Sequence, residues 1–322
     1  AFPEDHDLSM GMLGMHGTQY ANYAMSRADL IIAVGVRFDD RVTGNLAAFA
    51  PEAKFIHVDL DPAEISKNVT VDVPIVGDAK KVLTDLMAEV RKLDLPPERH
   101  LPWMEQVEAW KRDHPLLVKD SENGEIIPEA AVRRIWEVTR GEAVVCTEVG
   151  QNQMWAALHY LSRHPRRFIS SGGLGTMGFG FPAAIGAQVA CPDALVVDIA
   201  GDGSFQMTIQ ELATAVQYGL PVKVCILNNQ YLGMVRQWQE LFWNRRYSHT
   251  CVECQPDFVR LAEAYGAEGY RAAHPEELED VLRTAFASDR PAVIDIRVKR
   301  EANVFPMIPA GGTVHDMMER EP

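Results

Sequence analysis

The chain has 322 residues, 47% hydrophobic and 24% charged, which suits a globular protein of about two domains. Its 31 basic and 45 acidic residues give a net charge of −14, which argues against nucleic acid or an anionic membrane surface as a partner. No apolar run reaches the ~20 residues of a membrane helix, and no signal peptide is recognised, so we expect a cytoplasmic protein without membrane contact.

The first hundred residues alternate helical and strand patterns. A helix is expected over 18–27 and a buried parallel strand over 29–34; strands over 54–59 and 73–76 and an amphipathic helix over 79–92 follow. Gly35, Asp59 and Asp78 lie at strand ends, where α/β folds hold nucleotides. Because no Gly-x-Gly-x-x-Gly motif occurs here, a dinucleotide site and a plain α/β domain both remain open. The charged loop 35–44 could equally be a solvated turn.

Prolines concentrated in residues 95–102 indicate a boundary. We therefore predict one domain over 1–98, a linker over 99–127 that includes a helix over 103–114, and a second domain over 128–322. The second should contain helices over 128–140, 230–242, 257–265 and 275–287, a helix of small residues opened by Pro182, and strands over 143–147 and 291–297. The tail 305–313 is too rich in proline and glycine for regular structure and is either disordered or a lid.

The stretch 194–229 predicts a βαβ unit, with strands over 194–200 and 222–227. Thr208 and Glu211 indicate a capping box for its helix. The buried stripe of that helix is predicted to be Ile209, Leu212, Ala213 and Val216.

Polar residues follow both strands of this unit. Asp202 follows the first and Asn229 the second, 229 − 202 = 27 residues later, as one helix and a returning strand require. Both should face one crevice at the carboxyl edge of the sheet. Their oxygens suit Mg²⁺ shared with a phosphate, which Gly203 would let approach.

Gly201-Asp-Gly203 followed by Asn228-Asn229 resembles the cofactor motif of thiamine diphosphate-dependent enzymes. The resemblance implies that Asp202, Asn229 and the carbonyl of Tyr231 hold the metal. Other segments, in the same order, resemble the catalytic subunit of the acetohydroxyacid (acetolactate) synthase family. They are Gly11-Met-Leu-Gly-Met-His-Gly17, the loop 35–44, Ser171-Gly-Gly-Leu-Gly-Thr-Met-Gly178, Gly233-Met-Val-Arg-Gln-Trp238 and Met307-Ile-Pro-Ala-Gly-Gly312.

This resemblance implies two doubly wound α/β domains with mainly parallel sheets. It implies decarboxylation of pyruvate and carboligation of the two-carbon unit to a second 2-oxo acid, in branched-chain amino-acid synthesis. Small 2-oxo acids are the implied substrates. The implied cofactors are thiamine diphosphate, Mg²⁺ and FAD. The implied assembly is a homodimer or tetramer with a regulatory small subunit.

The resemblance also assigns site residues. Met207, Met234 and Trp238 are implied at the catalytic centre, with Met207 as an apolar buttress under the cofactor. The implied thiamine diphosphate contacts are Gln151, Asn152, Gly175, Met177, Gly201, Gly203, Ser204 and Asn229. Asn152 replaces a more usual histidine, which changes its charge and pH response. The implied FAD contacts are Met15, His16, Gly17, Gly35, Arg37, Asp39, Arg41, Asp59, Leu60 and Asp78.

The family's amino-terminal pyrimidine-binding domain, with its catalytic glutamate, is not recognised in these residues, so the chain alone is expected to be inactive. A flavin-using relative such as a pyruvate oxidase, or a non-catalytic cofactor-binding fragment needing an amino-terminal partner, remain alternatives. Cys251 and Cys254, with His249 upstream, could form half a zinc site or a redox pair, but without a second ligand pair an incidental loop pair is favoured.

Overall fold

A computed structural model describes residues 2–119 and 121–319. Residues 1, 120 and 320–322 lie outside this description. They fall in the predicted first domain, the predicted linker and the predicted second domain, respectively. The chain forms two compact units: unit 1 comprises Ala1–Ser9 and Leu117–Val304, and unit 2 comprises Met10–Leu116 and Phe305–Pro322. In the described residues, no helix combines the length and apolar character needed to cross a membrane.

Unit 1 contains a six-stranded parallel sheet of order β10-β11-β9-β8-β6-β7. Its strands are β6 (Val144–Thr147), β7 (Phe168–Ser170), β8 (Val196–Gly201), β9 (Lys223–Asn228), β10 (Glu268–Ala272) and β11 (Ala292–Arg297). The predicted strands correspond to the mostly apolar, almost entirely buried runs β6, β8, β9 and β11. The edge strands β7 and β10 were not predicted, because they are only partly buried and lack such runs.

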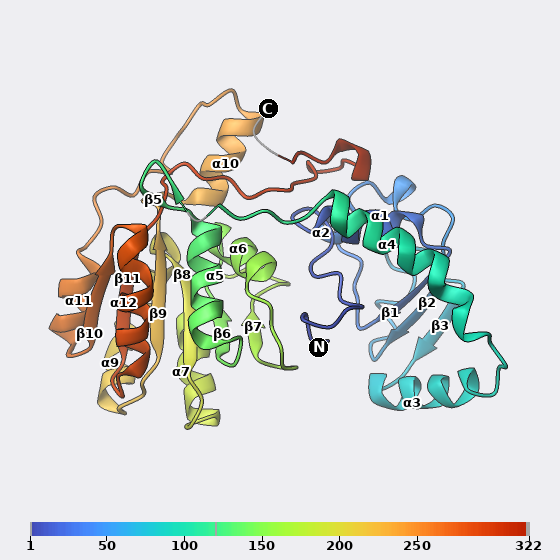
Figure 1. The fold of residues 1–322 in the computed structure, drawn as a ribbon, viewed down its shortest axis with the longest axis horizontal. Helices are drawn as coiled ribbons and strands as arrows, with labels where there is room; N and C mark the ends of the chain where they lie inside the picture. The colour runs from blue at the N-terminus through green and yellow to red at the C-terminus, as the bar shows by residue number, and fades with distance from the viewer. Residues whose placement is uncertain (1, 120, 320–322) are drawn as a thin grey trace. The chain divides into compact units, whose positions relative to one another are not determined.

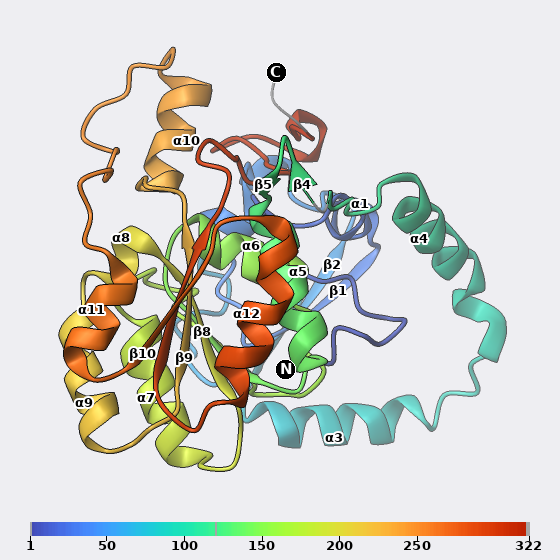
Figure 2. The same ribbon diagram turned by 60° about the vertical axis from the view of Figure 1, so that its left-hand side comes forward.

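Helices cover both faces of this sheet (Figures 1 and 2). One layer holds α5 (Pro128–Thr139), α6 (Gln151–His159) and α12 (Pro275–Ala287), and the other holds α7 (Gly180–Ala190), α9 (Leu212–Gln217) and α11 (Phe258–Tyr265). The second layer packs Phe181, Phe205 and Phe258 against the strands in one apolar cluster. The remaining elements are the hairpin of β4 (Ser121–Glu122) and β5 (Glu125–Ile126), the short α8 (Asp202–Phe205), η3 (Ile209–Glu211) and α10 (Gly233–Phe242). The α/β class with mainly parallel strands is confirmed.

The predicted capping box at Thr208 is wrong. The Thr208 side chain makes no cap; its hydroxyl donates to the Gly178 carbonyl over 3.2 Å, and the chain continues as the 3-10 turn η3 before α9. The buried stripe is also shifted, since Ala213 is exposed and Ala215 is fully buried. Thr208 thus bonds to the glycine-rich segment 171–178, here called the glycine loop. Glu211 accepts the hydroxyl of Thr214 from the helix that follows.

Unit 2 is built on a three-stranded parallel sheet of order β1-β2-β3. Its elements are α1 (Gln19–Arg27), β1 (Leu30–Val34), α2 (Asp40–Thr43), η1 (Leu46–Ala48), β2 (Lys54–Asp59), β3 (Val73–Val76), α3 (Ala79–Val90), η2 (Pro97–His100), α4 (Leu101–Asp113) and η4 (Val314–Asp316). Within the segment predicted as a linker, α4 packs its Trp110 on Tyr23 of α1.

Only one face of β1 is buried in unit 2. Ile31 and Ala33 join Phe38 and Phe55 in a small core, whereas Leu30 is 47% and Ile32 45% exposed. The prediction of a fully buried strand is therefore wrong for this unit. An apolar strand is buried on both faces only when structural layers cover both faces of its sheet.

The carboxyl-terminal segment is ordered as part of unit 2. Ile308 donates its backbone N–H to the Met15 carbonyl over 2.7 Å, and Gly312 accepts from the Asn45 N–H over 3.0 Å. Met307 is fully buried. The disordered alternative for the tail 305–313 is wrong, because backbone hydrogen bonds replace regular structure there. The lid alternative stays a prediction.

Candidate cofactor site

The order of strands in unit 1 creates a crevice at the carboxyl edge of its sheet. From β6 the chain passes to β7 on one side and then returns to β8 on the other, so the strand order reverses between β6 and β8. Open parallel sheets bind ligands at such a switch point. A pocket lies there, lined by the loop after β6, the start of α8 and the turn after β9, including Gly150, Gln151, Asp202, Asn229 and Tyr231.

Asp202 is the main charged group of this pocket. The side chain is 1% exposed, and its Oδ2 has no hydrogen-bond partner among the described residues. Burial raises the pKa of the carboxyl to about 7, while nearby backbone N–H groups oppose the shift and Asp295 adds to it. An unneutralised buried carboxylate fits a cation. One carboxylate and one amide leave the coordination shell of a Mg²⁺ ion unfilled. The oxygens of a diphosphate would fill it.

Asn229 and Tyr231 complete the metal set implied by the sequence. Asn229 is 4% exposed, and its Oδ1 accepts the backbone N–H of Tyr231 over 3.1 Å. Gln230 between them adopts φ 61°, which turns the chain sharply after β9. Asp202, Asn229 and Tyr231 all line the pocket, so the structure brings the predicted metal residues together.

The amides predicted to face the diphosphate are already engaged with protein atoms. Gln151 Nε2 donates to Gln237 Oε1 and to the Ala302 carbonyl, each over 2.9 Å, and its Oε1 accepts from Asn229. Asn152 Nδ2 donates to the Ile199 carbonyl over 2.9 Å. Both residues line the pocket, but their amide hydrogens hold neighbouring elements rather than pointing free into it.

Glu148 is a site-building residue that the sequence did not single out. Fully buried, it accepts from the N–H groups of Gly178 (2.7 Å) and Phe181 (3.0 Å) and from the Ser204 hydroxyl (2.6 Å). It therefore joins the glycine loop to α8. The position of Glu148, directly after the predicted strand over 143–147, is the sequence feature that could have identified it. Ser204, predicted at the diphosphate, lines the pocket with its hydroxyl already given to Glu148.

Asp198 lies on β8 behind this loop and is fully buried, with neither carboxyl oxygen hydrogen-bonded among the described residues. Burial, and then the Glu148 charge, raise the pKa of Asp198 well above its usual range. Gly180 passes directly over it: a Cβ there would stand 2.6 Å from Asp198 Oδ1. The glycine allows the loop to approach the sheet closely.

The other predicted residues are distributed unevenly around the pocket. Gly201, Gly203, Met177 and Met234 line it. Gly175 is exposed in the glycine loop with φ 68°, and Met207 is 54% exposed; neither is among the lining residues. Trp238 is half-buried on α10, with its ring 5.6 Å from that of Phe242. Roles for these side chains stay predictions.

Most residues predicted to contact FAD have structural partners in unit 2. Arg37 pairs with Asp39 at 2.5 Å, and Arg41 lies 3.6 Å from Asp40. Asp39 caps α2, Asp78 caps α3, and Asp59 accepts the Asp61 N–H. A pocket in this unit includes Met15 in its lining but not the other predicted contacts: His16, Gly17, Gly35, Arg37, Asp39, Arg41, Asp59, Leu60 and Asp78.

The pair of Cys251 and Cys254 does not form a metal centre with neighbouring side chains. Across residues 2–119 and 121–319, no three His, Cys, Asp or Glu side chains are grouped to hold a metal ion. Cys251 lies near Glu253 and Arg300 instead, and both cysteines are exposed free thiols. The alternatives for this pair stay predictions.

Comparison with known proteins adds a family assignment to this geometry. Residues 148–296 match the family model of the thiamine pyrophosphate enzyme C-terminal TPP-binding domain, and residues 1–86 match that of the central domain. The chain is 49% identical to the acetolactate synthase isozyme 3 large subunit of Escherichia coli, over 98% of this chain and 56% of that protein. It is 48% identical to the acetolactate synthase large subunit of Haemophilus influenzae, over 100% and 56%.

A third relative, the acetolactate synthase of Mycobacterium leprae, is 49% identical over 97% of this chain and 51% of its own length. The chain thus spans about half the length of the curated relatives it matches.

Proposed function

Because this chain belongs to the thiamine pyrophosphate enzymes and corresponds to the carboxyl-terminal part of acetolactate synthase large subunits, we propose that it contributes the diphosphate and metal half of an acetolactate synthase active site. The reaction is decarboxylation of pyruvate and transfer of the two-carbon unit to pyruvate or 2-oxobutyrate. The observation that carries the proposal is the unpartnered buried oxygen of Asp202, in one pocket with Asn229 and Tyr231.

Each part of the pocket has a role in this proposal. Asp202, the Asn229 amide oxygen and the Tyr231 carbonyl would hold Mg²⁺, whose charge would offset that of the diphosphate. Gly203 leaves the backbone accessible to a phosphate. Thiamine diphosphate, when bound, supplies the electron sink that decarboxylation of a 2-oxo acid requires. Met177 and Met234 supply apolar walls that exclude water from the reacting groups.

The proposal includes FAD in unit 2, near the strand ends at Gly35, Asp59 and Asp78, on the strength of the family resemblance. It also includes a homodimer or tetramer. Because the E. coli and H. influenzae relatives are named large subunits, a small subunit is the proposed further partner. The glutamate that activates the cofactor in this family is assigned to the amino-terminal domain, outside these 322 residues.

Calorimetry of thiamine diphosphate binding to the chain, with and without Mg²⁺, tests the cofactor assignment directly. Binding that requires Mg²⁺ supports the proposal. Equal affinity without the metal would contradict it, because the diphosphate has no cationic side chain in the pocket lining.

Acetolactate formation from pyruvate tests the reaction. The chain is assayed with Mg²⁺, thiamine diphosphate and FAD, first alone and then with the amino-terminal fragment of the E. coli relative. We expect product only in the second assay, since the activating acid comes from that fragment. Turnover by the chain alone would overturn the residue assignments, and flavin bleaching by anaerobic pyruvate would favour a pyruvate oxidase instead.

A further inference from the structure

We propose that Gln237, on α10, is a positioning residue that turns the amide oxygen of Asn229 toward the metal, through Gln151. This inference rests on the proposed function, because Asn229 matters as a metal ligand only if the pocket binds Mg²⁺ with thiamine diphosphate. It adds residues that do not touch the cofactor. Three buried amides and the backbone of residues 302–304, here called the strap, carry it.

The first amide is fixed by the strap. Gln237 is fully buried; its Oε1 accepts the Val304 N–H over 2.8 Å, and its Nε2 donates to the Val304 carbonyl over 3.1 Å. A backbone N–H can only donate and a backbone carbonyl can only accept. The Gln237 carboxamide therefore has one orientation, with its oxygen available to a further donor.

The second amide takes its orientation from the first. Gln151 Nε2 donates to Gln237 Oε1 and to the Ala302 carbonyl, each over 2.9 Å. Both are acceptors, so the NH₂ group of Gln151 must face them and its oxygen must face away. That oxygen accepts from Asn229 Nδ2 over 3.1 Å.

The third amide is the proposed metal ligand. Because Asn229 gives its Nδ2 to Gln151, its Oδ1 lies on the opposite side, where it accepts the Tyr231 N–H over 3.1 Å. Gln151 is 3% and Asn229 4% exposed. If either amide were flipped, donors would face donors and acceptors would face acceptors, with no water to satisfy them. The strap, acting through Gln237 and Gln151, and the Tyr231 N–H together fix which Asn229 atom is presented to a cation.

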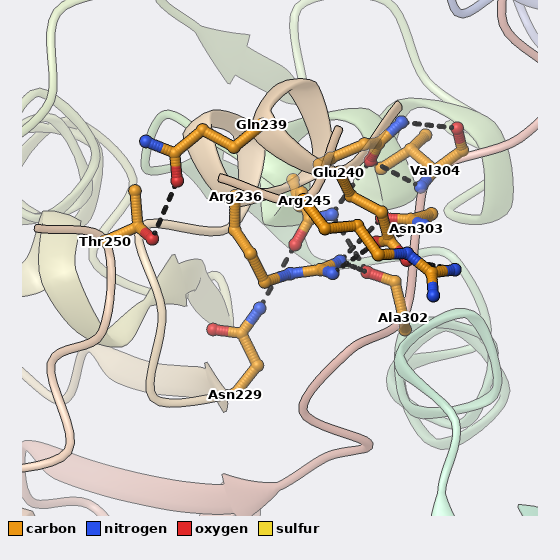
Figure 3. A network of polar contacts seen from close by, with 11 residues as sticks. Asn229, Arg236, Gln239, Glu240, Arg245, Thr250, Ala302, Asn303 and Val304 are labelled. Carbon is orange, nitrogen blue, oxygen red and sulfur yellow. Dashed lines mark hydrogen bonds and ion pairs between the residues drawn. The ribbon is translucent and has the colours of Figure 1, made fainter. Parts of the chain in front are cut away.

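Two neighbouring residues border this chain of amides or its strap. Gly233 packs on it: a Cβ there would lie 1.9 Å from Gln151 Oε1 and 2.8 Å from Asn229 Nδ2. Arg236, 1% exposed, anchors the same strap by donating to the Ala302 carbonyl and to Asn303 Oδ1 (Figure 3). It also pairs at 2.6 Å with Glu240 of its own helix, which accepts from Asn303 Nδ2, and its guanidinium lies 5.7 Å from the centre of the Tyr231 ring. Arg236 holds the strap but does not hydrogen-bond to the Gln151, Asn229 or Gln237 amides in these contacts, so it provides a matched control.

The test is a double-mutant cycle on the 322-residue chain, read as the Mg²⁺ dissociation constant by calorimetry with thiamine diphosphate in excess. Gln237→Met removes the hydrogen bonds at similar volume and should weaken Mg²⁺ binding about tenfold, as loss of an outer-shell partner does. In an Asn229→Ala background the same change should have no effect, because the oxygen that it positions is absent. An equal loss in both backgrounds would show a general structural effect and overturn the proposal.

Two further variants complete the design. Arg236→Met should lower the melting temperature of unit 1 yet leave Mg²⁺ affinity within about twofold, since Gln151 still donates to Gln237 Oε1, which the bonds to Val304 keep in place. A tenfold loss there would assign the effect to strap anchoring and contradict the proposal. If Gln237→Met does not fold, Gln237→Leu, which removes the same hydrogen bonds, replaces it in the cycle. Wild-type chain that binds no Mg²⁺ with thiamine diphosphate would instead refute the proposed function.

Discussion

The two units share parallel strands with polar residues at the strand ends, but they use these residues differently: among the described residues, Asp202 and Asn229 of unit 1 line one pocket, whereas Asp59 and Asp78 of unit 2 do not line the pocket of that unit. In unit 1 the sheet has six strands and helices on both faces, and Asp202 is buried without a partner for Oδ2. In unit 2 the sheet has three strands, β1 has an open face, and Asp59 and Asp78 bond to nearby backbone groups.

This difference shows what converts a strand-end carboxylate into a ligand site. Burial removes water, and the reversal of strand order brings a second loop opposite the first. Asp202 has both conditions. The acids of unit 2 lie at turns where a backbone N–H is the nearest donor, so they stabilise helices and turns. The following predictions test this contrast, from the largest expected effect to the smallest.

Core truncation should separate the units most strongly. Ile199→Ala, at a fully buried position of β8, should cost ~2–5 kcal/mol of unfolding free energy through lost packing and a cavity. Ile32→Ala, at a 45% exposed position of β1, should cost less than ~1 kcal/mol. Amide hydrogen exchange resolved to β8 and β1 would measure each unit separately. Equal losses would contradict the open face of β1.

Acid should weaken unit 2 through His16. Burial, and then the Arg41 charge, lower the pKa of His16 to about 4 from its ordinary 6.5. Between these values the unfolded ring takes up a proton and the folded ring does not, so stability present above pH ~6.5 is lost as the pH falls toward ~4, by up to ~3 kcal/mol. Hydrogen exchange of β1 amides across this range should show the loss, and His16→Gln should remove it. A pH dependence unchanged in the variant would assign the effect to another group.

Two matched aspartates at strand ends test the pocket itself. Asp202→Ala should lower Mg²⁺-dependent affinity for thiamine diphosphate on the order of 100-fold, or about 3 kcal/mol, because the metal loses its charged ligand. Asp59→Ala should leave that affinity unchanged. Calorimetry of both variants decides, and equal affinity in wild type and Asp202→Ala would remove Asp202 from the metal site.

Trp238 tests whether the site extends along α10. In the assembly with the amino-terminal fragment, Trp238→Ala should reduce the preference for 2-oxobutyrate over pyruvate about tenfold, since one methylene in an apolar contact is worth ~1–3 kcal/mol. Trp243→Ala, 56% exposed beyond the end of α10, is the control. The product ratio from mixed substrates measures the effect. An unchanged ratio in Trp238→Ala would assign this indole a packing role beside Phe242 instead.

Local sequence determined much of this protein. Runs rich in β-branched and other apolar residues predicted β6, β8, β9 and β11, and the apolar periodicity between Pro275 and Ala287 predicted α12 at its observed bounds. The spacing of Asp202 and Asn229 predicted one shared crevice, because a βαβ unit must return its second strand parallel to the first. Resemblance to a known family then supplied the chemistry that periodicity alone could not.

Tertiary structure decided what depends on neighbours distant in sequence. The edge strands β7 and β10 form only because β6 and β11 offer free hydrogen-bonding edges. The placement of Glu148 under the glycine loop, and the orientation of Asn229 by Gln151, Gln237 and Val304, join residues up to 86 positions apart. A carboxamide can present either its oxygen or its nitrogen, and sequence does not encode which. The surrounding donors and acceptors impose that choice once the chain has packed.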